Sequence, residues 1–482
     1  MRFLEITTCP GKYMYWHYRL HPGLAGQPYA RQRAEFLSDG VGAGLRVAGE
    51  MGGLGYTAET IVANNIPLQT AWAAENRMPM PAAPADLVLE QINRFEPDIL
   101  YITECLAFDG RFLSRLARRP RLVLGWHSAP VPENADWSGY DLMLSPLSAC
   151  REVAAARGAA ATDHAFPGFD ASQLLPPGSI KRDLDVAFAG AWDARHAQRN
   201  ALLETLAQAA LNKPDPAGNA GFSAIFCLDA LSREDLPSST AALDRGAVWG
   251  KRMYGLLAGA RIVVNAAADH ASGEIPNLRH MEATGMGALL LAQGHPSLRA
   301  FFQEGEVAAF ASAQEMLEKI QYYLAHEEER QAMAGRGQAR CLRDFGLPAR
   351  ARAMDRRIER ALRPQSFTPA ERETLLRQTR AYLAGGPRGL VEAAGAAVDK
   401  DLTAAIWESF CRGDAGEVAA LAQAREQLSA DAFELDFCRC LSRAMSGDLP
   451  AALVCLRQEL ENFPENDRAR GIYAGLLGHY PA

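Results

Sequence analysis

Two glutamates, an asparagine and an arginine fall within nine residues near the middle of the chain. Glu274 and Glu282 are separated by seven residues, and Asn277 and Arg279 lie between them. Carboxylates accept hydrogen bonds from sugar hydroxyls, and a guanidinium can neutralise a diphosphate. The set is therefore suited to binding a sugar nucleotide. The alternative is an i, i+3 surface ion pair between Arg279 and Glu282, with Asn277 as a simple helix N-cap.

The surrounding sequence predicts the elements that hold these side chains. A buried strand is expected over 260–266, a small polar loop over 266–276, a helix from Asn277 to the glycines at 285 and 287, and a second strand over 288–292. A helix N-terminus attracts phosphate, and the carboxyl end of a parallel strand is where open α/β sheets bind ligands. Asn265, at that end of the first strand, is included in the expected donor site.

The stretch NLRHMEATGMGALLL and the sequence after it resemble the C-terminal half of GT-B glycosyltransferases, over about residues 180–345. Its residue pattern is similar to that of the CgeB-like group and of glycosyltransferase family 1. The resemblance implies two Rossmann-like domains with parallel sheets facing across a cleft, and a hexosyltransferase-like activity. It also implies a nucleotide-diphosphate sugar as the donor substrate, with no further cofactor. Glu274 is then expected at the transferred sugar as a catalytic residue, and Glu282 at the ribose.

A second group of donor-binding residues is expected at the start of the C-terminal domain. A strand over 185–190 ends at Gly190, and Arg195 and Arg199 come after it. The resemblance implies that Gly190 lets a phosphate approach and that both arginines reach the diphosphate; the alternative is a plain tight turn. The Asp183-Leu184-Asp185 run precedes a strand instead of ending one, so we expect a surface position and no metal site.

The N-terminal part alternates strands with helices, which predicts a parallel sheet. The strands are expected over 2–8, 59–63, 98–102, 122–125 and 141–144, and one helix over the glycine-rich stretch 30–55. His127 comes just after the fourth strand and can donate or accept a proton near neutral pH. The resemblance makes His127 an acceptor-side catalytic candidate, and a structural histidine is the equal alternative. The aromatic stretch 12–29 is expected either to contact a sugar acceptor or to pack on the domain surface.

Length and spacing predict three domains: 1–175 on the acceptor side, 176–363 on the donor side and 366–482 as a helical, weakly tetratricopeptide-like tail. Breaks in the tail are expected at 385–387, 413–414 and 447–448. Helical hairpins offer grooves, so a protein or peptide acceptor is one expected partner of the tail. Buttressing or dimerisation is the alternative role. The basic helix over 349–362 could meet phosphate, but a solvated face is the expectation.

Composition narrows the class of protein. The net charge is −7, which argues against a general binder of nucleic acid or anionic membranes. No apolar run is long enough to span a bilayer, and the first residues do not form a signal peptide. The nine cysteines are scattered without a metal or redox spacing, which favours the cytoplasm.

These observations predict metal-independent transfer of a sugar from a nucleotide-diphosphate sugar to the hydroxyl of a glycan, protein or small molecule. The two-glutamate arrangement leans towards retention of configuration. The alternatives are a non-catalytic scaffold that binds a protein through its helical tail, and a sugar-nucleotide epimerase of the same fold.

Overall fold

The computed structural model describes residues 1–80, 82–176, 178–212, 221–230, 232–269, 274, 277–363, 368–383, 388–428 and 432–479. The chain divides into two compact units, Met1–Ala351 and Arg352–Ala482. The first unit holds two parallel sheets, and the second is helical.

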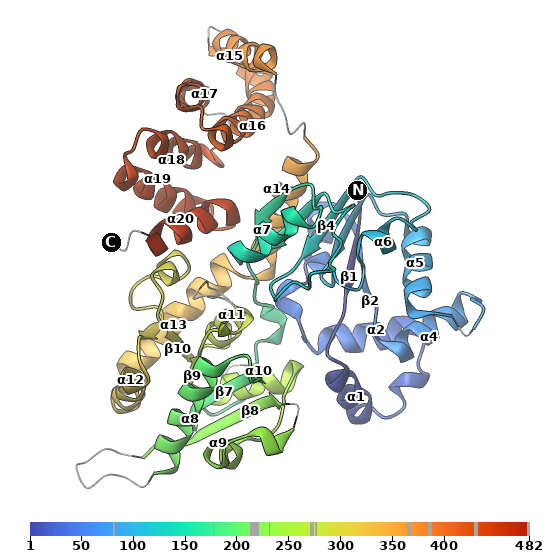
Figure 1. Ribbon diagram of the computed structural model, residues 1–482, viewed down its shortest axis with the longest axis vertical. Helices are drawn as coiled ribbons and strands as arrows, with labels where there is room; N and C mark the ends of the chain where they lie inside the picture. Colours follow the sequence, from blue (N-terminus) through green and yellow to red (C-terminus); the bar gives the residue numbers. More distant parts are fainter. Residues whose placement is uncertain are drawn as a thin grey trace. The chain divides into compact units, whose positions relative to one another are not determined.

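The first sheet has six parallel strands in the order β2-β1-β3-β4-β5-β6. Figure 1 labels β1, β2 and β4. Its strands are β1 (Arg2–Thr7), β2 (Thr57–Val62), β3 (Ile99–Ile102), β4 (Leu122–Trp126), β5 (Leu142–Ser145) and β6 (Thr162–His164). The accompanying helices are α1 (Gly11–Leu20), α2 (Tyr29–Ser38), α3 (Ala48–Met51), α4 (Ile66–Glu75), α5 (Pro84–Phe95), α6 (Gly110–Leu113) and α7 (Ser148–Ala156). Every residue of β3 and β4 is buried, because central parallel strands are covered on both faces.

The second sheet has five parallel strands in the order β11-β10-β9-β7-β8. Its strands are β7 (Leu184–Trp192), β8 (Ala224–Ala230), β9 (Ala260–Asn265), β10 (Leu289–Gln293) and β11 (Ala308–Phe310). Its helices are α8 (Ala197–Leu211), α9 (Ser238–Leu243), α10 (Gly250–Gly259), α11 (Leu278–Gly285), α12 (Ala313–Ala325) and α13 (Glu327–Asp344). The expected fold class, two Rossmann-like parallel sheets of GT-B type followed by a helical region, is confirmed.

Three expectations for these sheets need correction. The stretch 30–55 is not one helix: α2 ends at Ser38, and Gly40 and Gly42 then adopt positive φ, a conformation that breaks a helix and that glycine tolerates best. The short strands β6 and β11 are additional to those expected. β7 runs two residues beyond Gly190, which therefore lies within the strand instead of ending it.

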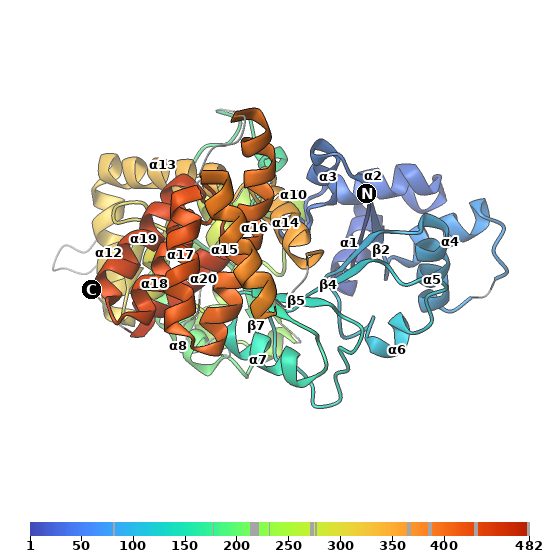
Figure 2. The ribbon, with the colours of Figure 1, turned by 90° about the horizontal axis from the view of Figure 1, so that it is seen from above.

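The second unit is built from helices that pack against their neighbours in sequence. After α14 (Leu347–Ala361), within which the boundary between the units falls, these are α15 (Pro369–Leu383), α16 (Arg388–Arg412), α17 (Ala415–Leu428), α18 (Leu435–Met445), α19 (Leu449–Asn462) and α20 (Asp467–His479). Figure 2 shows α15, α16 and α17 side by side. Two of the expected breaks are found: Gly413 and Gly447 have positive φ, and Asp414 and Asp448 cap the next helices. The break expected at 385–387 lies outside the described residues.

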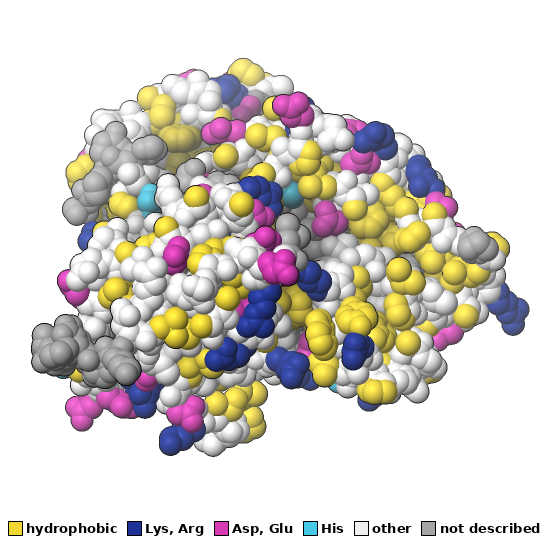
Figure 3. Space-filling model, turned by 60° about the horizontal axis from the view of Figure 1, so that its bottom comes forward, with side chains coloured by type: hydrophobic (Ala, Val, Ile, Leu, Met, Phe, Trp, Pro, Cys, Tyr) yellow, Lys and Arg dark blue, Asp and Glu magenta, His cyan; other side chains and the backbone are white. Residues whose placement is uncertain are grey.

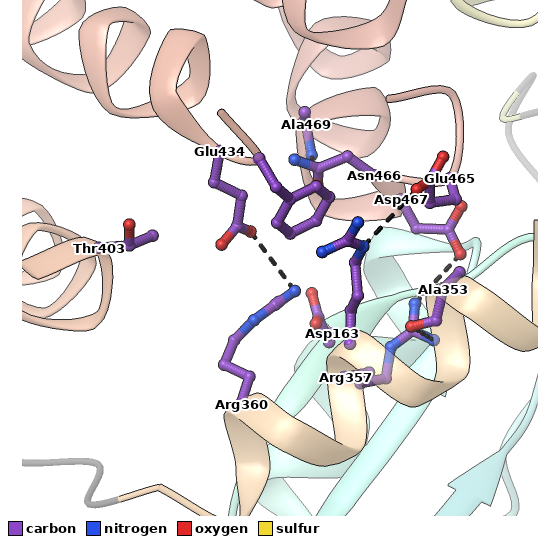
Figure 4. A network of polar contacts seen from close by, with 12 residues as sticks. Asp163, Ala353, Arg357, Arg360, Thr403, Glu434, Glu465, Asn466, Asp467 and Ala469 are labelled. Atoms are coloured by element: carbon purple, nitrogen blue, oxygen red, sulfur yellow. Dashed lines mark hydrogen bonds and ion pairs between the residues drawn. The ribbon is translucent and has the colours of Figure 1, made fainter. Parts of the chain in front are cut away.

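The basic helix α14 does not present a solvated face of arginines, contrary to the expectation. Arg357 is buried, and its guanidinium lies 3.1 Å from the Asp467 carboxylate. Arg360 pairs with Glu434 at 3.4 Å (Figure 4). A buried guanidinium needs a partner of this kind, and carboxylates of the later helices supply it. These arginines therefore belong to the structure of the helical unit.

No helix in the described ranges is long and apolar enough to cross a membrane.

Candidate functional site

A cavity of about 350 Å³ lies between the two sheets of the first unit. From the first sheet's side it is lined by Leu45, Trp126, Ser128 and Leu147, among others. Seven of the nine site residues predicted from the sequence line it from the other side: Gly190, Arg199, Asn265, Glu274, Asn277, Arg279 and Glu282. The structure thus brings together residues from β7, α8, β9 and the start of α11, and Glu274 from between β9 and α11.

The start of α11 is fixed against the end of β9 by three polar side chains. Asn277 is the N-cap: its side chain accepts from the backbone N–H of His280, and its own N–H donates to His280 Nδ1 at 3.2 Å. Asn265 Nδ2 lies 3.0 Å from the same ring nitrogen and 3.2 Å from Asn277 Oδ1. This network holds the first turn of α11, a position that attracts anions, at the cavity wall.

His280 is a positioning residue that the sequence analysis missed. It is buried, and burial lowers the pKa of its imidazole to about 4, so the ring is neutral at pH 7. Its place three residues after Asn277 is the N3 position of a capping box, a signal that was available. A neutral ring suits its role, because Nδ1 must accept hydrogen bonds from two N–H donors.

The low pKa of His280 predicts a loss of stability in mild acid. The folded-state pKa lies below the unfolded value of 6.5, so the stabilisation is present above about pH 6.5 and is lost as the pH falls towards 4. Between pH 7 and pH 5 we expect the wild type to lose about 2 kcal/mol more unfolding free energy than His280→Gln, which does not titrate. Chemical denaturation at both pH values measures the difference. Parallel losses in the two proteins would show that His280 is protonated in the folded state.

Arg279 and Glu282 do form the i, i+3 ion pair of the alternative interpretation, with Nη1 2.9 Å from Oε2. The pair is not a surface one, because the two side chains are only 15% and 9% exposed and both residues line the cavity. Arg279 Nη1 also lies 2.9 Å from the sulfur of Met253. Its Nε is buried and has no hydrogen-bond partner among the described residues. A buried N–H donor without a partner is costly, and an anionic ligand bound in the cavity would supply the missing acceptor.

Arg199, in the first turn of α8, is the second cavity arginine. It is 8% exposed, its Nη2 donates to the Ala191 carbonyl at 2.6 Å, and its Nε is also buried with no hydrogen-bond partner in the described structure. Burial lowers its pKa, against the opposing pull of Asp269 and Asp193. Asp269 accepts from the backbone N–H of Gln198, so the N-terminus of α8 already has a carboxylate. The N-terminus of α11 is therefore the better place for a ligand phosphate.

Glu274 reaches across the cavity to the first sheet's side. Its two carboxylate oxygens lie 2.9 and 3.2 Å from the backbone N–H of Ser148, the first residue of α7. A reciprocal contact occurs elsewhere between the two sheets, where Asp39 Oδ1 accepts from the backbone N–H of Lys251 in the first turn of α10 at 3.3 Å. Gly250 permits that approach, because a Cβ there would lie 1.9 Å from Asp39 Oδ2. Glu274, from the part of the chain around the second sheet, thus binds the N-terminus of a helix beside the first sheet. Asp39, from the part around the first sheet, binds the N-terminus of a helix beside the second.

His127 and Arg195 are not among the residues that line the cavity. His127 is buried, its ring packs against Trp137 with centroids 5.4 Å apart, and burial lowers its pKa. Its neighbours in sequence, Trp126 and Ser128, do line the cavity. The Arg195 side chain is 76% exposed and pairs with Asp193 at 2.6 Å.

The described part of the chain contains no group of three or more His, Cys, Asp and Glu side chains placed to hold a metal ion.

Comparison with known proteins adds three findings. No curated protein matches the chain. Among solved structures, HepE from Anabaena in complex with UDP and glucose is 15% identical, with a TM-score of 0.49 over 74% of this chain and 99% of that one. A glycosyltransferase from Rickettsia africae is 13% identical (TM-score 0.47, 75% and 98%), and sucrose-phosphate synthase from Thermosynechococcus elongatus is 12% identical (TM-score 0.43, 74% and 98%). Residues 225–356, which include β9 and α11, match the protein family described as "Glycosyl transferase-like".

Proposed function

We propose that the protein transfers a sugar from a nucleotide-diphosphate sugar to an acceptor hydroxyl. One observation carries the proposal: Arg199, which is buried, and Arg279, whose side chain is 15% exposed, line one cavity together with the first turn of α11, and each has a buried Nε without a partner in the described structure. A diphosphate would supply acceptors for both guanidinium groups and for the helix N-terminus. The match of residues 225–356 to a glycosyl transferase-like family supports the same conclusion.

The remaining cavity residues take roles that their chemistry suggests. Glu282, beside Arg279, accepts hydrogen bonds from the ribose hydroxyls, and Glu274 accepts from hydroxyls of the transferred sugar. Asn277 and Asn265 hold the helix start in place, and Gly190 leaves room for the phosphate. His127 remains our candidate on the acceptor side, and Arg195 our candidate for a more distant contact with the diphosphate.

In the proposed reaction, the bond between the anomeric carbon and the diphosphate oxygen breaks while the acceptor oxygen bonds to that carbon. The nucleoside diphosphate departs with the bonding electrons, and its released oxygen takes up the acceptor proton. Arg199, Arg279 and the α11 N-terminus stabilise the charge that develops on the leaving group, which is why we propose that no metal is needed. The two-glutamate arrangement leads us to favour retention at the anomeric carbon.

We further propose the division of the chain into 1–175, 176–363 and 366–482, with the helical tail docking a protein or peptide that carries the acceptor. We also propose a cytoplasmic location, since all nine cysteines are free thiols, as a reducing compartment would maintain them.

A thermal-shift screen tests the proposed function. The panel contains UDP-glucose, UDP-N-acetylglucosamine, GDP-mannose, ADP-glucose and NAD, and a ligand at 100 times its Kd stabilises the folded state by about 2.7 kcal/mol. We expect one sugar nucleotide, and not NAD, to raise the melting temperature by a few degrees. Interconversion of that sugar nucleotide in the absence of an acceptor would identify an epimerase instead. Failure of the whole panel to shift the wild type would favour the scaffold.

A further inference from the structure

The exposed face of α1 is a second part of the first unit whose side chains are suited to binding a ligand. On its inner face, Tyr13 and His17 are buried and pack against Phe36. On its outer face, Tyr15 and Trp16 are 59% and 47% exposed, which is unusual for aromatic rings that could have packed inside. The inner face of this helix therefore packs, as one of the two expectations for the segment has it. The outer face is free to contact a ligand, which is the other expectation.

The outer face of α1 begins at Lys12, which contacts the second sheet. Lys12 Nζ lies 2.7 Å from the Asp229 carboxylate and 2.9 Å from the Ala230 carbonyl, at the carboxyl end of β8. Asp229 is paired in register with Ala191 of β7, the residue after Gly190 at the cavity. Lys12 and the residues three, four and seven positions later share one face of a helix. Lys12, at the start of the face that carries Tyr15, Trp16 and Arg19, therefore lies against the carboxyl end of the second sheet.

The side chains on this face are held in a defined arrangement. The Arg19 guanidinium carbon lies 5.4 Å from the centre of the Tyr15 ring and 5.6 Å from that of the Trp16 ring. Arg19 also donates to the Tyr15 hydroxyl at 2.7 Å, and the two rings are 6.0 Å apart at 73°. Rings fixed in this way offer apolar surface at a low entropic cost of binding, and the guanidinium offers N–H donors beside them.

We propose that Tyr15, Trp16 and Arg19 form a binding site for a neutral saccharide, which is the acceptor of the transferred sugar. This inference rests on the proposed function. The apolar C–H face of a sugar ring packs on an aromatic ring, while the sugar hydroxyls accept hydrogen bonds from the guanidinium. Asp229 neutralises Lys12, and Arg19 keeps one positive charge beside the rings. One basic side chain contributes only weakly to binding at an anionic membrane surface, so this charge does not make the face a membrane site. Figure 3 shows hydrophobic side chains with Lys and Arg between them over the lower face of Figure 1, where α1 lies.

Isothermal titration calorimetry of the full chain with maltohexaose, cellohexaose and chitohexaose tests this site. We expect at least one of the three to bind the wild type. Trp16→Ala and Tyr15→Ala should each raise its Kd about 10-fold or more, because exposed aromatic rings dominate such contacts. Leu20→Ala is the matched control: Leu20 is 50% exposed on the same helix but has no ring, so its Kd should stay within about twofold of the wild type.

The proposed function is measured separately, as the melting-temperature shift that sugar nucleotides cause in the same variants. Shifts equal to that of the wild type, together with lost saccharide binding, support an acceptor site distinct from the donor site. The inference is overturned if donor nucleotides bind and none of the three oligosaccharides does. It is also overturned if Leu20→Ala, Tyr15→Ala and Trp16→Ala all reduce binding to phosphatidylglycerol vesicles while oligosaccharides have no effect, because the face would then dock on a membrane.

Discussion

Replacing Arg199 with alanine is expected to weaken sugar-nucleotide binding about 100-fold without lowering the melting temperature of the free protein. A hydrogen bond to a charged group contributes about 1.5–3 kcal/mol, and a guanidinium makes more than one to a diphosphate. Arg199 forms no ion pair among the described residues. Its replacement costs the free protein the hydrogen bond to the Ala191 carbonyl but also removes one buried donor without a partner, and the two effects offset each other. Binding should therefore fall while stability stays constant or rises.

Calorimetric titration with the sugar nucleotide found in the thermal-shift screen measures this effect. Arg252→Ala, at an exposed position of α10, is the control and should bind as the wild type does. Arg199→Lys, which keeps the charge but loses the forked geometry, should lie between the two. If Arg199→Ala destabilises the protein and binds normally, then Arg199 is a structural residue of α8 and the donor site lies elsewhere.

Replacing Glu274 with glutamine is expected to lower kcat about 100-fold while the Kd of the nucleotide changes less than threefold, within the range for loss of one charged transition-state contact. Glutamine keeps an oxygen that can accept from the Ser148 N–H, so the link to α7 persists, but the negative charge beside the sugar is lost. Glu274→Ala removes both the negative charge and the acceptor for the Ser148 N–H. Steady-state kinetics with the cognate sugar nucleotide distinguishes the two roles.

The comparison between the Glu274 variants is decisive because the residue both lines the cavity and caps a helix. If glutamine restores the activity that alanine loses, Glu274 acts only by holding α7. If both variants are equally inactive and melt normally, its charge acts on the substrate. Full activity in both would remove Glu274 from the reaction altogether.

Local signals made much of the second sheet predictable. The apolar run of β9, the N-cap Asn277 and the glycines after α11 are adjacent in sequence, and the structure places the element boundaries within two residues of those expected. The same holds for Gly413-Asp414 and Gly447-Asp448, where one residue ends a helix and the next caps another. Such boundaries depend on backbone conformation and hydrogen bonds between near neighbours, which residue type reveals directly.

The remaining features depend on contacts between distant residues. The contact between Glu274 and Ser148 joins positions 126 residues apart, and no local sequence pattern predicts it. β6 and β11 have three residues each, too few to show a periodicity. Arg357 looks like a surface residue in the sequence of α14, yet a carboxylate 110 positions away makes its burial possible. The prediction of one helix over 30–55 was wrong because a glycine can either continue a helix or break it, and residue type alone does not decide between the two.

The reciprocal capping between the two sheets has a consequence for substrate exchange. When the two domains of the first unit separate, Glu274 and Asp39 lose helix N–H groups but gain water, and so do the helix ends that they leave. Because water replaces each partner, the net cost is about 1 kcal/mol per contact. These two contacts therefore fix the relative direction of the two sheets but contribute little to the cost of separating them. If the protein is the transferase that we propose, breaking these two contacts adds little to the barrier for release of the nucleoside diphosphate.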